Sequence, residues 1–185
     1  GGQARLQVSG KNGEYSIAYG EKTEFFRGLA LLTDKIKKEE KEFDIIEQKG
    51  FDTCGVMFDV SRNAVLKPES VKDLLRKMAL MGLNMAMLYT EDTYRIDGYP
   101  YFGYMRGAYS KEEIREMDAY AGIFGIELIP CIQTLAHLKT TLRWQYADAM
   151  KDTDQILLVD EPKTYEFIEK MMETASECYT TKQIH

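Results

Sequence analysis

Residues 81–89 read Met81-Gly-Leu-Asn-Met-Ala-Met-Leu-Tyr89, and residues 124–130 read Phe124-Gly-Ile-Glu-Leu-Ile-Pro130. In both stretches a glycine suited to ending a helix is followed at once by a short apolar run typical of a buried strand. A helix that leads directly into such a strand is part of a βαβ unit. The repetition of this arrangement predicts an α/β fold with a parallel sheet.

The same alternation extends to both sides. Gly55-Val-Met-Phe-Asp59 predicts an earlier buried strand, and Lys182-Gln-Ile-His185 predicts the beginning of a later one. Helices are expected to begin at Pro68, after Ser110 in a Ser-x-x-Glu capping box, and at Pro162. The loops after the second and third strands are long, and such loops carry the functional groups of barrel enzymes.

The first fifty residues follow a different pattern. An Asn-Gly pair between Leu6-Gln-Val8 and Tyr15-Ser-Ile-Ala-Tyr19 predicts a hairpin, and Phe43-Asp-Ile-Ile-Glu47 predicts a third strand. Thr23 is placed to cap a helix between them. The expected apolar face of that helix consists of Phe25, Phe26, Leu29, Leu32 and Ile36. We therefore expect a small α/β prefix domain over residues 1–50 and a second domain over residues 51–185.

Length and charge restrict the fold and the partners. A complete (β/α)₈ barrel takes about 250 residues and at least about 200, so a chain of 185 residues can hold only part of one. The net charge is -6, and no block of Lys or Arg is present. This argues against a nucleic acid or an anionic membrane as the partner. The longest nearly apolar stretch, Ala119 to Ile132, contains Glu127 and is shorter than the roughly 20 residues of a membrane span.

The three cysteines, Cys54, Cys131 and Cys178, are odd in number and widely separated. Their spacing indicates neither a disulfide framework nor a zinc site, and it favours a reducing compartment, so we expect a cytoplasmic protein. None of them has a suitably spaced histidine partner. This spacing therefore predicts no metal. No cofactor is predicted either, since no glycine-rich loop that could hold a phosphate follows a strand.

Polar side chains follow each of the first three strands of the predicted parallel sheet. They are Asp59 and Arg62, then Glu91 and Asp92, then Gln133 and His137. Because the carboxyl ends of parallel strands meet at one edge, these groups form a carboxylate-rich set suited to a polyhydroxylated ligand.

Each of these groups also has a purely structural interpretation. Asp59 and Arg62 can pair with each other, Glu91 and Asp92 can cap a turn, and His137 can be a structural histidine. Their shared position at one edge favours a binding site.

Two other features suggest chemistry but have simpler explanations. The second loop and Trp144 bring many aromatic rings, which stack on sugars, although packing is the simpler interpretation for most of them. The acid pair Asp160-Glu161 directly precedes Pro162 at a helix start, where acids stabilise the helix dipole. Capping is therefore expected there instead of catalysis.

Four segments resemble glycoside hydrolase family 20 and occur in the family's order. The nearest branch comprises bacterial N-acetyl-β-D-glucosaminidases that lack a secretion signal. The segments are Gly55-Val-Met-Phe-Asp-Val-Ser-Arg62, Leu88-Tyr-Thr-Glu-Asp92, Pro100-Tyr-Phe-Gly-Tyr-Met-Arg-Gly107 and Ile129-Pro-Cys-Ile-Gln-Thr-Leu-Ala-His137. The resemblance spans residues 50 to 185, and the first fifty are similar to the family's small α/β prefix domain. It implies a (β/α)₈ barrel, of which this chain holds the first half.

The resemblance also implies a reaction. Family members remove terminal β-linked N-acetylglucosamine or N-acetylgalactosamine with retention, by a substrate-assisted mechanism. A glutamic acid protonates the glycosidic oxygen while the substrate's own acetamido oxygen, oriented by the preceding aspartate, attacks the anomeric carbon. That Asp-Glu pair follows the fourth strand, and Ile184-His185 matches the opening of its motif. We therefore expect the pair a few residues beyond His185 and no catalytic residue within the chain.

Within the chain, the resemblance implies substrate-binding roles. They fall on Asp59, Arg62, Glu91, Asp92, Gln133 and His137, of which His137 matches the family histidine near the catalytic acid. Cys54 stands where typical members have a sugar-binding arginine, and Gln133 replaces an acid.

Three readings of the chain follow. The first is a hexosaminidase fragment that is inactive as it stands. The alternatives are a non-catalytic carbohydrate-binding or regulatory half-barrel module, and a structural piece without retained function. The expected ligands are N-acetylhexosamine-containing glycans. Because a half barrel exposes strand edges and an apolar interior, we also expect self-association.

Overall fold

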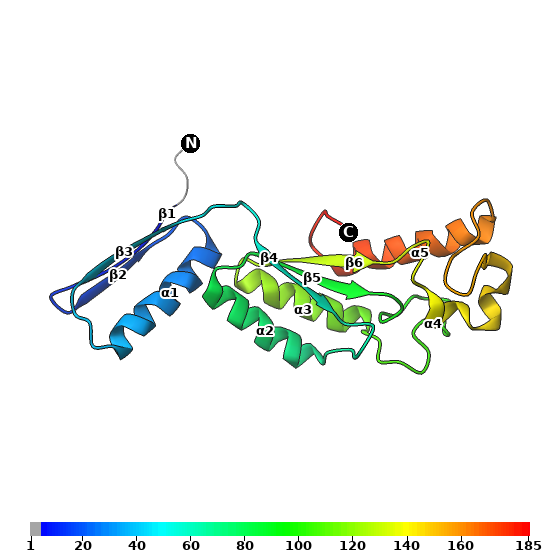
Figure 1. The fold of residues 1–185 in the computed structure, drawn as a ribbon, viewed down its shortest axis with the longest axis horizontal. Coiled ribbons are helices and arrows are strands. Elements are labelled where there is room, and N and C mark those ends of the chain that lie inside the picture. Colours follow the sequence, from blue (N-terminus) through cyan, green and yellow to red (C-terminus); the bar gives the residue numbers. More distant parts are fainter. Residues whose placement is uncertain (1–4) are drawn as a thin grey trace.

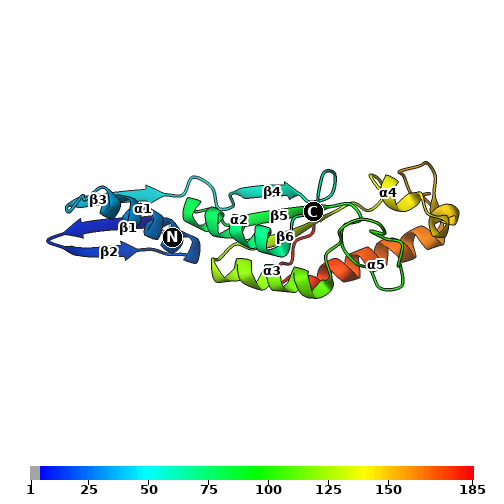
Figure 2. The ribbon, with the colours of Figure 1, turned by 90° about the horizontal axis from the view of Figure 1, so that it is seen from below.

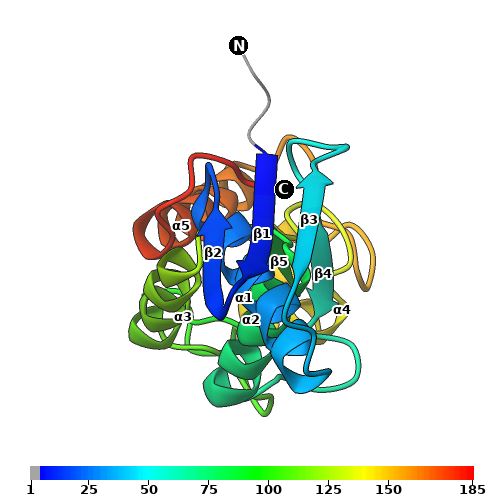
Figure 3. The same cartoon turned by 90° about the vertical axis from the view of Figure 1, so that its left-hand side faces the viewer.

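A computed structural model describes residues 5–185, and within them lie two three-stranded sheets joined by a connection around residue 50 (Figure 1). Residues 1–4 of the expected prefix domain lie outside the described residues. The molecule is elongated, with the first sheet at one end, the second sheet in the middle and residues 139–161 at the other end (Figures 1 and 2), and Figure 3 shows the first sheet facing the viewer.

The first sheet is antiparallel with strand order β2-β1-β3. Its strands are β1 (Arg5–Lys11), β2 (Glu14–Ala18) and β3 (Phe43–Gln48). The predicted hairpin is confirmed, since Asn12 and Gly13 have φ of 54° and 82°, the left-handed values that a tight hairpin turn requires. Helix α1 (Lys22–Lys37) packs closely on this sheet: a Cβ on Gly28 would come within 2.6 Å of the Ile17 side chain.

The start and the buried face of α1 differ from the prediction. Thr23 is not the N-cap, because Glu21 occupies that position and Thr23 lies buried in the first turn. The side chain of Glu24 accepts hydrogen bonds from the amides of Gly20 and Glu21, at 2.7 and 3.0 Å, as the N3 glutamate of a capping box does, so the N-cap lies two residues before Thr23. The predicted apolar face is only partly buried, since 39% of Leu29 and 49% of Ile36 are exposed.

The second sheet is parallel with strand order β4-β5-β6, as the helix–strand alternation predicts. Its strands are β4 (Gly55–Asp59), β5 (Met85–Thr90) and β6 (Glu127–Ile132). Helices α2 (Pro68–Met81) and α3 (Lys111–Ile123) connect them and cover one side of the sheet (Figure 1).

The predicted signals for the ends of these helices are confirmed. Pro68 is the first residue of α2, and Gly82 ends it in the left-handed conformation with φ of 78°. Ser110 and Glu113 form the expected capping box of α3: each side chain accepts the other's backbone amide, at 3.1 and 2.8 Å. Each connecting helix is thus defined by local sequence.

After β6 the chain forms three further helical segments. They are α4 (Lys139–Leu142), the 3₁₀ helix η1 (Gln145–Met150) and α5 (Pro162–Cys178). Helix α5 packs against α3, and both helices contribute to the hydrophobic core. The largest fully buried side chains of this core include Leu75, Leu88, Met117, Leu128, Leu138, Leu142, Leu157, Phe167 and Met171. No helix within residues 5–185 is long and apolar enough to cross a membrane.

The fourth predicted strand, Lys182–His185, is present only in its last residue. No strand is assigned there, but the His185 amide donates to the Pro130 carbonyl at 3.0 Å. The His185 carbonyl in turn accepts from the Ile132 amide at 2.9 Å. This is the bonding pattern of a parallel neighbour, so His185 occupies the place next to Cys131 of β6.

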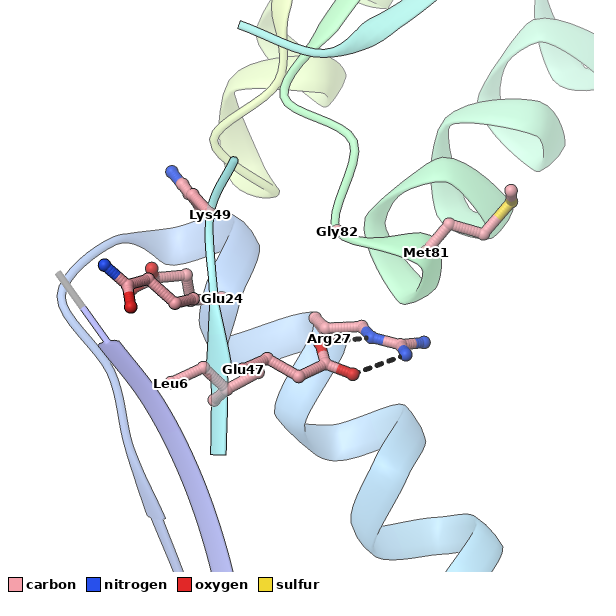
Figure 4. A pocket seen from close by; sticks show the side chains of 8 residues that line it. Leu6, Glu24, Arg27, Glu47, Lys49, Met81 and Gly82 are labelled. Atoms are coloured by element: carbon pink, nitrogen blue, oxygen red, sulfur yellow. Dashed lines mark hydrogen bonds and ion pairs between the residues drawn. The ribbon is translucent and has the colours of Figure 1, made fainter. Parts of the chain in front are cut away.

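Helix α1 joins the two sheets by packing against the ends of α2 and α3. The rings of Phe26 and Phe124 meet edge to face at 4.9 Å. Beside this contact lies a small cavity of about 110 Å³, in which the Arg27 guanidinium donates two hydrogen bonds to Glu47, at 2.9 and 2.8 Å (Figure 4). Arg27 and Glu47 neutralise each other, so we interpret this cavity as part of the junction between the two sheets and not as a ligand site.

Candidate functional site

The candidate site lies at the carboxyl edge of the parallel sheet, where β4, β5 and β6 lead into loops (Figure 1). We call residues 91–110 the β5 loop and residues 133–161 the β6 loop. Strand register places Asp59, Tyr89 and Cys131 in one row across the sheet, and His185 pairs next to Cys131. Side chains in one row of a parallel sheet point to the same face, so this row forms the floor beneath the loops.

Asp59 holds the loop after β4, but not through the side chain of Arg62. Its Oδ1 accepts hydrogen bonds from the backbone amides of Ser61 and Arg62, both at 3.0 Å. This is the local turn that aspartate favours. The alternative that the Asp59 and Arg62 side chains pair with each other is therefore wrong, and Arg62 is left to project elsewhere.

Arg62, Tyr89 and Glu91 form one cluster. The Arg62 guanidinium donates to Glu91 Oε1 at 3.3 Å and to the Tyr89 hydroxyl at 3.1 Å, and it lies 5.3 Å from the centre of the Tyr89 ring. The hydrogen bonds that Arg62 donates to Glu91 and, to a smaller extent, to Tyr89 raise the pKa of Arg62, whereas burial is the main cause that raises the pKa of Tyr89. The side chain of Arg62 is 56% exposed, so the cluster is open to a ligand.

Tyr89 was not among the predicted site residues. It lies at the end of a strand that reads as a simple apolar run, and nothing in that run singles it out. The signal that could have identified it is its row, because it stands opposite Asp59 in the register of β4 and β5.

Asp92 belongs to a second, more deeply buried cluster. Only 1% of its side chain is exposed, and its Oδ1 accepts a hydrogen bond from Arg106 Nη1 at 2.5 Å. The same nitrogen lies 3.1 Å from the Thr140 hydroxyl, so Arg106 connects the β5 loop to the β6 loop. Gly103 lies close to the backbone of Asp92. It has φ of 71°, and a Cβ there would lie 2.4 Å from the Asp92 carbonyl oxygen. Asp92 therefore organises the loops as well as adding charge.

Gln133 and His137 are not joined to either cluster. Gln133 is half-buried and His137 is exposed, and among residues 5–185 neither side chain forms a hydrogen bond. His137 has φ of 61°, a left-handed conformation that is unusual for a residue with a side chain. The structure thus places both residues on the β6 loop without a structural partner that would explain them.

The cysteines show one contact that the sequence analysis missed. Cys131 Sγ lies 3.2 Å from His185 Nδ1, so the expectation that no cysteine has a histidine partner is wrong. Burial raises the pKa of the Cys131 thiol, which favours a neutral thiol over the thiolate that a nucleophile needs. All three cysteines are free.

Cys54 lies at the amino end of β4, opposite to the end that carries Asp59. A thiol is a weak hydrogen-bond donor on a much shorter side chain than a guanidinium, so Cys54 does not supply the contact that the resemblance assigns to an arginine at this position. Glu161, by contrast, behaves as predicted and caps α5, since its carboxylate accepts the Lys163 amide at 3.3 Å.

The arrangement is suited to binding. Glu91 and Asp92, at the start of the β5 loop, are engaged by arginines, and the Arg62 cluster offers a guanidinium, a phenol and a carboxylate to hydroxyl groups of a ligand. Within residues 5–185, no three His, Cys, Asp or Glu side chains gather in a way that could hold a metal ion.

Comparisons with known proteins agree on one family. A family model described as "Glycosyl hydrolase family 20, catalytic domain" matches residues 51–185. A curated β-hexosaminidase from Emericella nidulans is 29% identical over 159 residues, which cover 71% of this chain and 26% of that protein.

Solved structures show the same α/β fold. A chitobiase from Flavobacterium johnsoniae matches with a TM-score of 0.83 and 22% identity, covering 98% of this chain and 31% of that one. An exo-β-N-acetylglucosaminidase from Vibrio harveyi, solved in complex with N-acetylglucosamine, matches with a TM-score of 0.80 and 21% identity, covering 98% and 35%. The chain thus spans 26% to 35% of the length of these three relatives.

Proposed function

The chain belongs to glycosyl hydrolase family 20, and on this premise we propose that it is part of a β-N-acetylhexosaminidase. Such an enzyme removes terminal β-linked N-acetylglucosamine or N-acetylgalactosamine by substrate-assisted, retaining hydrolysis. The observation that carries the proposal is the match over residues 51–185, together with acidic and basic side chains at the ends of β4 and β5. N-acetylhexosamine-containing glycans are the ligands that we propose.

We propose further that residues 51–185 form the first half of a (β/α)₈ barrel and that residues 1–50 form a separate prefix domain. Two features support the half barrel. The parallel strands follow chain order, and His185 continues the sheet beside β6 with parallel hydrogen bonds. The antiparallel sheet of the first fifty residues supports a separate unit.

In this proposal the predicted residues bind the sugar. Arg62 is accessible at the end of the sheet and can contact hydroxyl groups, together with the partly buried Glu91 that it pairs with. Asp92 holds the two loops in place through Arg106. Gln133 and His137 are available on the β6 loop, and Asp59 positions Arg62 by fixing the turn before it.

We propose that the 185-residue chain does not hydrolyse glycosides by itself. Its strand-end carboxylates are engaged by arginines or by backbone amides, which is an arrangement for binding and not for donating a proton. The Asp-Glu pair that the family uses would have to come from residues after the fourth strand.

The test compares this chain with the longer protein that includes the remaining strands. We expect the longer protein to release nitrophenol from the p-nitrophenyl N-acetyl-β-D-glucosaminide and the 185-residue chain to release none. In the longer protein, Glu91→Gln should lower kcat/KM about tenfold, the loss expected for a charged hydrogen bond. Glu112→Gln, at an 80% exposed site on α3, is the matched control. Turnover by the repurified 185-residue chain would refute the inactivity proposal.

A second candidate function is a non-catalytic carbohydrate-binding module. It is favoured because the carboxylates of Glu91 and Asp92 are both paired with arginines. It predicts saturable binding of N-acetylglucosamine that weakens in His137→Ala, and no hydrolysis even by the longer protein. The hydrolysis assay therefore distinguishes the two candidates.

The three free cysteines favour a reducing compartment, and we propose a cytoplasmic location on that ground.

A further inference from the structure

Four aromatic side chains of the β5 and β6 loops form a cluster that is distinct from the two polar clusters described above. We call Tyr101, Tyr104, Trp144 and Tyr146 the aromatic platform. The Trp144 ring lies 5.6 Å from Tyr101 and 5.2 Å from Tyr104, and Tyr101 stacks on Tyr146 at 6.3 Å with an angle of 15°. Three of its members, Tyr101, Trp144 and Tyr146, line a cavity of about 450 Å³ together with Gln145.

Packing explains the neighbouring aromatic rings but not this cluster. Phe102 is only 4% exposed and lies against Phe167 of the core. Tyr101 and Tyr104, in contrast, remain 45% and 48% exposed although they belong to the same loop. Exposed aromatic rings grouped around a cavity, with few polar groups between them, are typical of a ligand site.

The platform is held in one shape before any ligand arrives. The Tyr104 amide donates to the Tyr101 carbonyl at 3.2 Å, and the Tyr146 hydroxyl lies 2.5 Å from the Thr141 hydroxyl. The Arg143 guanidinium lies 4.6 Å from the centre of the Trp144 ring. A preformed site of this kind loses little freedom on binding.

The platform also belongs to the same two loops as the polar clusters. Arg106 joins Asp92 to Thr140. Arg106 lies close in sequence to Tyr104, and Thr140 lies close in sequence to Trp144. Burial and, to a smaller extent, the charge of Asp92 raise the pKa of Tyr146, so the platform lies near the Asp92 cluster.

We propose that the aromatic platform binds a second pyranose ring of the glycan, beyond the residue held by the polar groups, an inference that rests on the proposed function. A β-linked sugar of gluco configuration carries its hydroxyl groups around the rim and presents C–H groups on its faces. Such a face stacks on indole and phenol rings. Gln145 and the tyrosine hydroxyls supply polar partners for the rim.

Trp144 makes the proposal directly measurable because it is the only tryptophan in the chain. We would titrate the 185-residue protein with the β-linked disaccharide of N-acetylglucosamine, with the monosaccharide, and with sucrose as a control solute, following tryptophan emission. The disaccharide should change the emission saturably and at lower concentration than the monosaccharide, and sucrose should have no saturable effect.

Variants then separate stacking from other causes. Tyr101→Ala should weaken disaccharide binding about five- to tenfold, the value of one aromatic stacking contact, and Tyr101→Phe should restore it because the ring is retained. Tyr104→Ala should also weaken binding, which provides a second test at an exposed position. Tyr165→Ala is the matched control, since Tyr165 is 52% exposed on α5 and remote from the platform in sequence.

The proposal would be overturned if the emission did not saturate, or if Tyr101→Ala and Tyr104→Ala bound the disaccharide as Tyr165→Ala does. The result is separable from the proposed function. Hydrolysis by the longer protein with no Trp144 response would refute the platform alone. A Trp144 response that depends on Tyr101, combined with no hydrolysis by the longer protein, would refute the hydrolase and leave the platform standing.

Discussion

Asp92 and Arg106 form the most deeply buried ion pair described at the strand ends, with side-chain exposures of 1% and 18%. Arg106→Ala would leave the Asp92 carboxylate buried without its partner. We expect a loss of about 3–5 kcal/mol in the free energy of unfolding, as for other broken buried pairs. Urea denaturation followed by circular dichroism measures it.

A surface pair provides the control for this prediction. Arg76 pairs with Asp73 on α2, and both side chains are 47% exposed, so Arg76→Ala should cost less than about 1 kcal/mol. Adding Asp92→Asn to Arg106→Ala should recover part of the loss, since it removes the uncompensated charge. Equal effects of Arg106→Ala and Arg76→Ala would contradict this account of the buried pair.

Buried tyrosines make the protein sensitive to alkali. Burial raises the pKa of Tyr146 to about 12, and it raises the pKa of Tyr109 and Tyr179 as well. Below about pH 10, where an unfolded tyrosine begins to ionise, the phenols are protonated in both states. Above it the unfolded state loses protons first, so stability must fall as pH rises toward the folded pKa.

Urea midpoints measured from about pH 9 to about pH 11.5 test this direction. Tyr146→Phe should make the decline shallower, because it removes one titrating group. Tyr165→Phe changes a tyrosine that is 52% exposed and should leave the slope as it is. A midpoint that stays constant over this range would show the tyrosine explanation to be wrong.

At the scale of elements, the contact between α1 and the end of α3 depends on a glycine. Gly125 has φ of 75°, and a Cβ there would lie 2.8 Å from the Cβ of Lys22. Gly125→Ala should therefore destabilise the fold by about 1–2 kcal/mol from the backbone conformation alone. Thermal or urea unfolding of the variant checks the value.

Gly122 is the matched control, because it lies within α3 and a Cβ there would meet nothing within 4 Å. Gly122→Ala should stabilise the protein by about 0.5–1 kcal/mol, since alanine loses less freedom in a helix. If both alanine variants were destabilised equally, the close contact at Gly125 would not be the cause.

The elements themselves were largely predictable, because their signals are local. Pro68, Gly82 and the Ser110–Glu113 box act within one turn of the helix that each one starts or ends. Thr23 failed as a cap because an equally local signal, the capping box of Glu21 and Glu24, starts the helix two residues earlier. Sequence patterns alone do not rank two such competitors.

Which residues lie at the carboxyl edge of the parallel sheet could be predicted, but which of them pair with each other could not. The strand-end rule correctly placed Asp59, Glu91 and Asp92 at one edge. Which arginine meets which carboxylate depends on loop paths that no periodicity encodes, as the contact of Arg62 with Glu91 shows. The same reason explains why Tyr89 was missed.

At the scale of the whole molecule, apolar side chains on and near β4 remain open to solvent. Phe51, Val56 and Met57 are 78%, 37% and 47% exposed. Among the described strands, β4 pairs only with β5 and so leaves one edge free. We predict that the chain self-associates through this region, so light scattering should give an average mass that rises with concentration.

Met57→Glu should shift the protein toward monomer by placing a charge on the apolar surface. Met172→Glu is the control, since Met172 is 38% exposed but lies on α5. A single monomeric mass at high concentration of the unmodified chain would contradict the prediction.

The chain order of the parallel strands has a consequence for how the molecule assembles. Each strand of β4-β5-β6 lies beside the strand made just before it, and His185 takes the next place. Each pairing joins residues that are far apart along the chain, such as Gly55 with Met85 and Met85 with Glu127, which slows folding but lets each strand pair once its own connecting helix has been made. The sheet can therefore grow by one strand and one helix at a time while the polypeptide leaves the ribosome. During synthesis, one open edge is the strand most recently added, while the other open edge among the described strands remains β4.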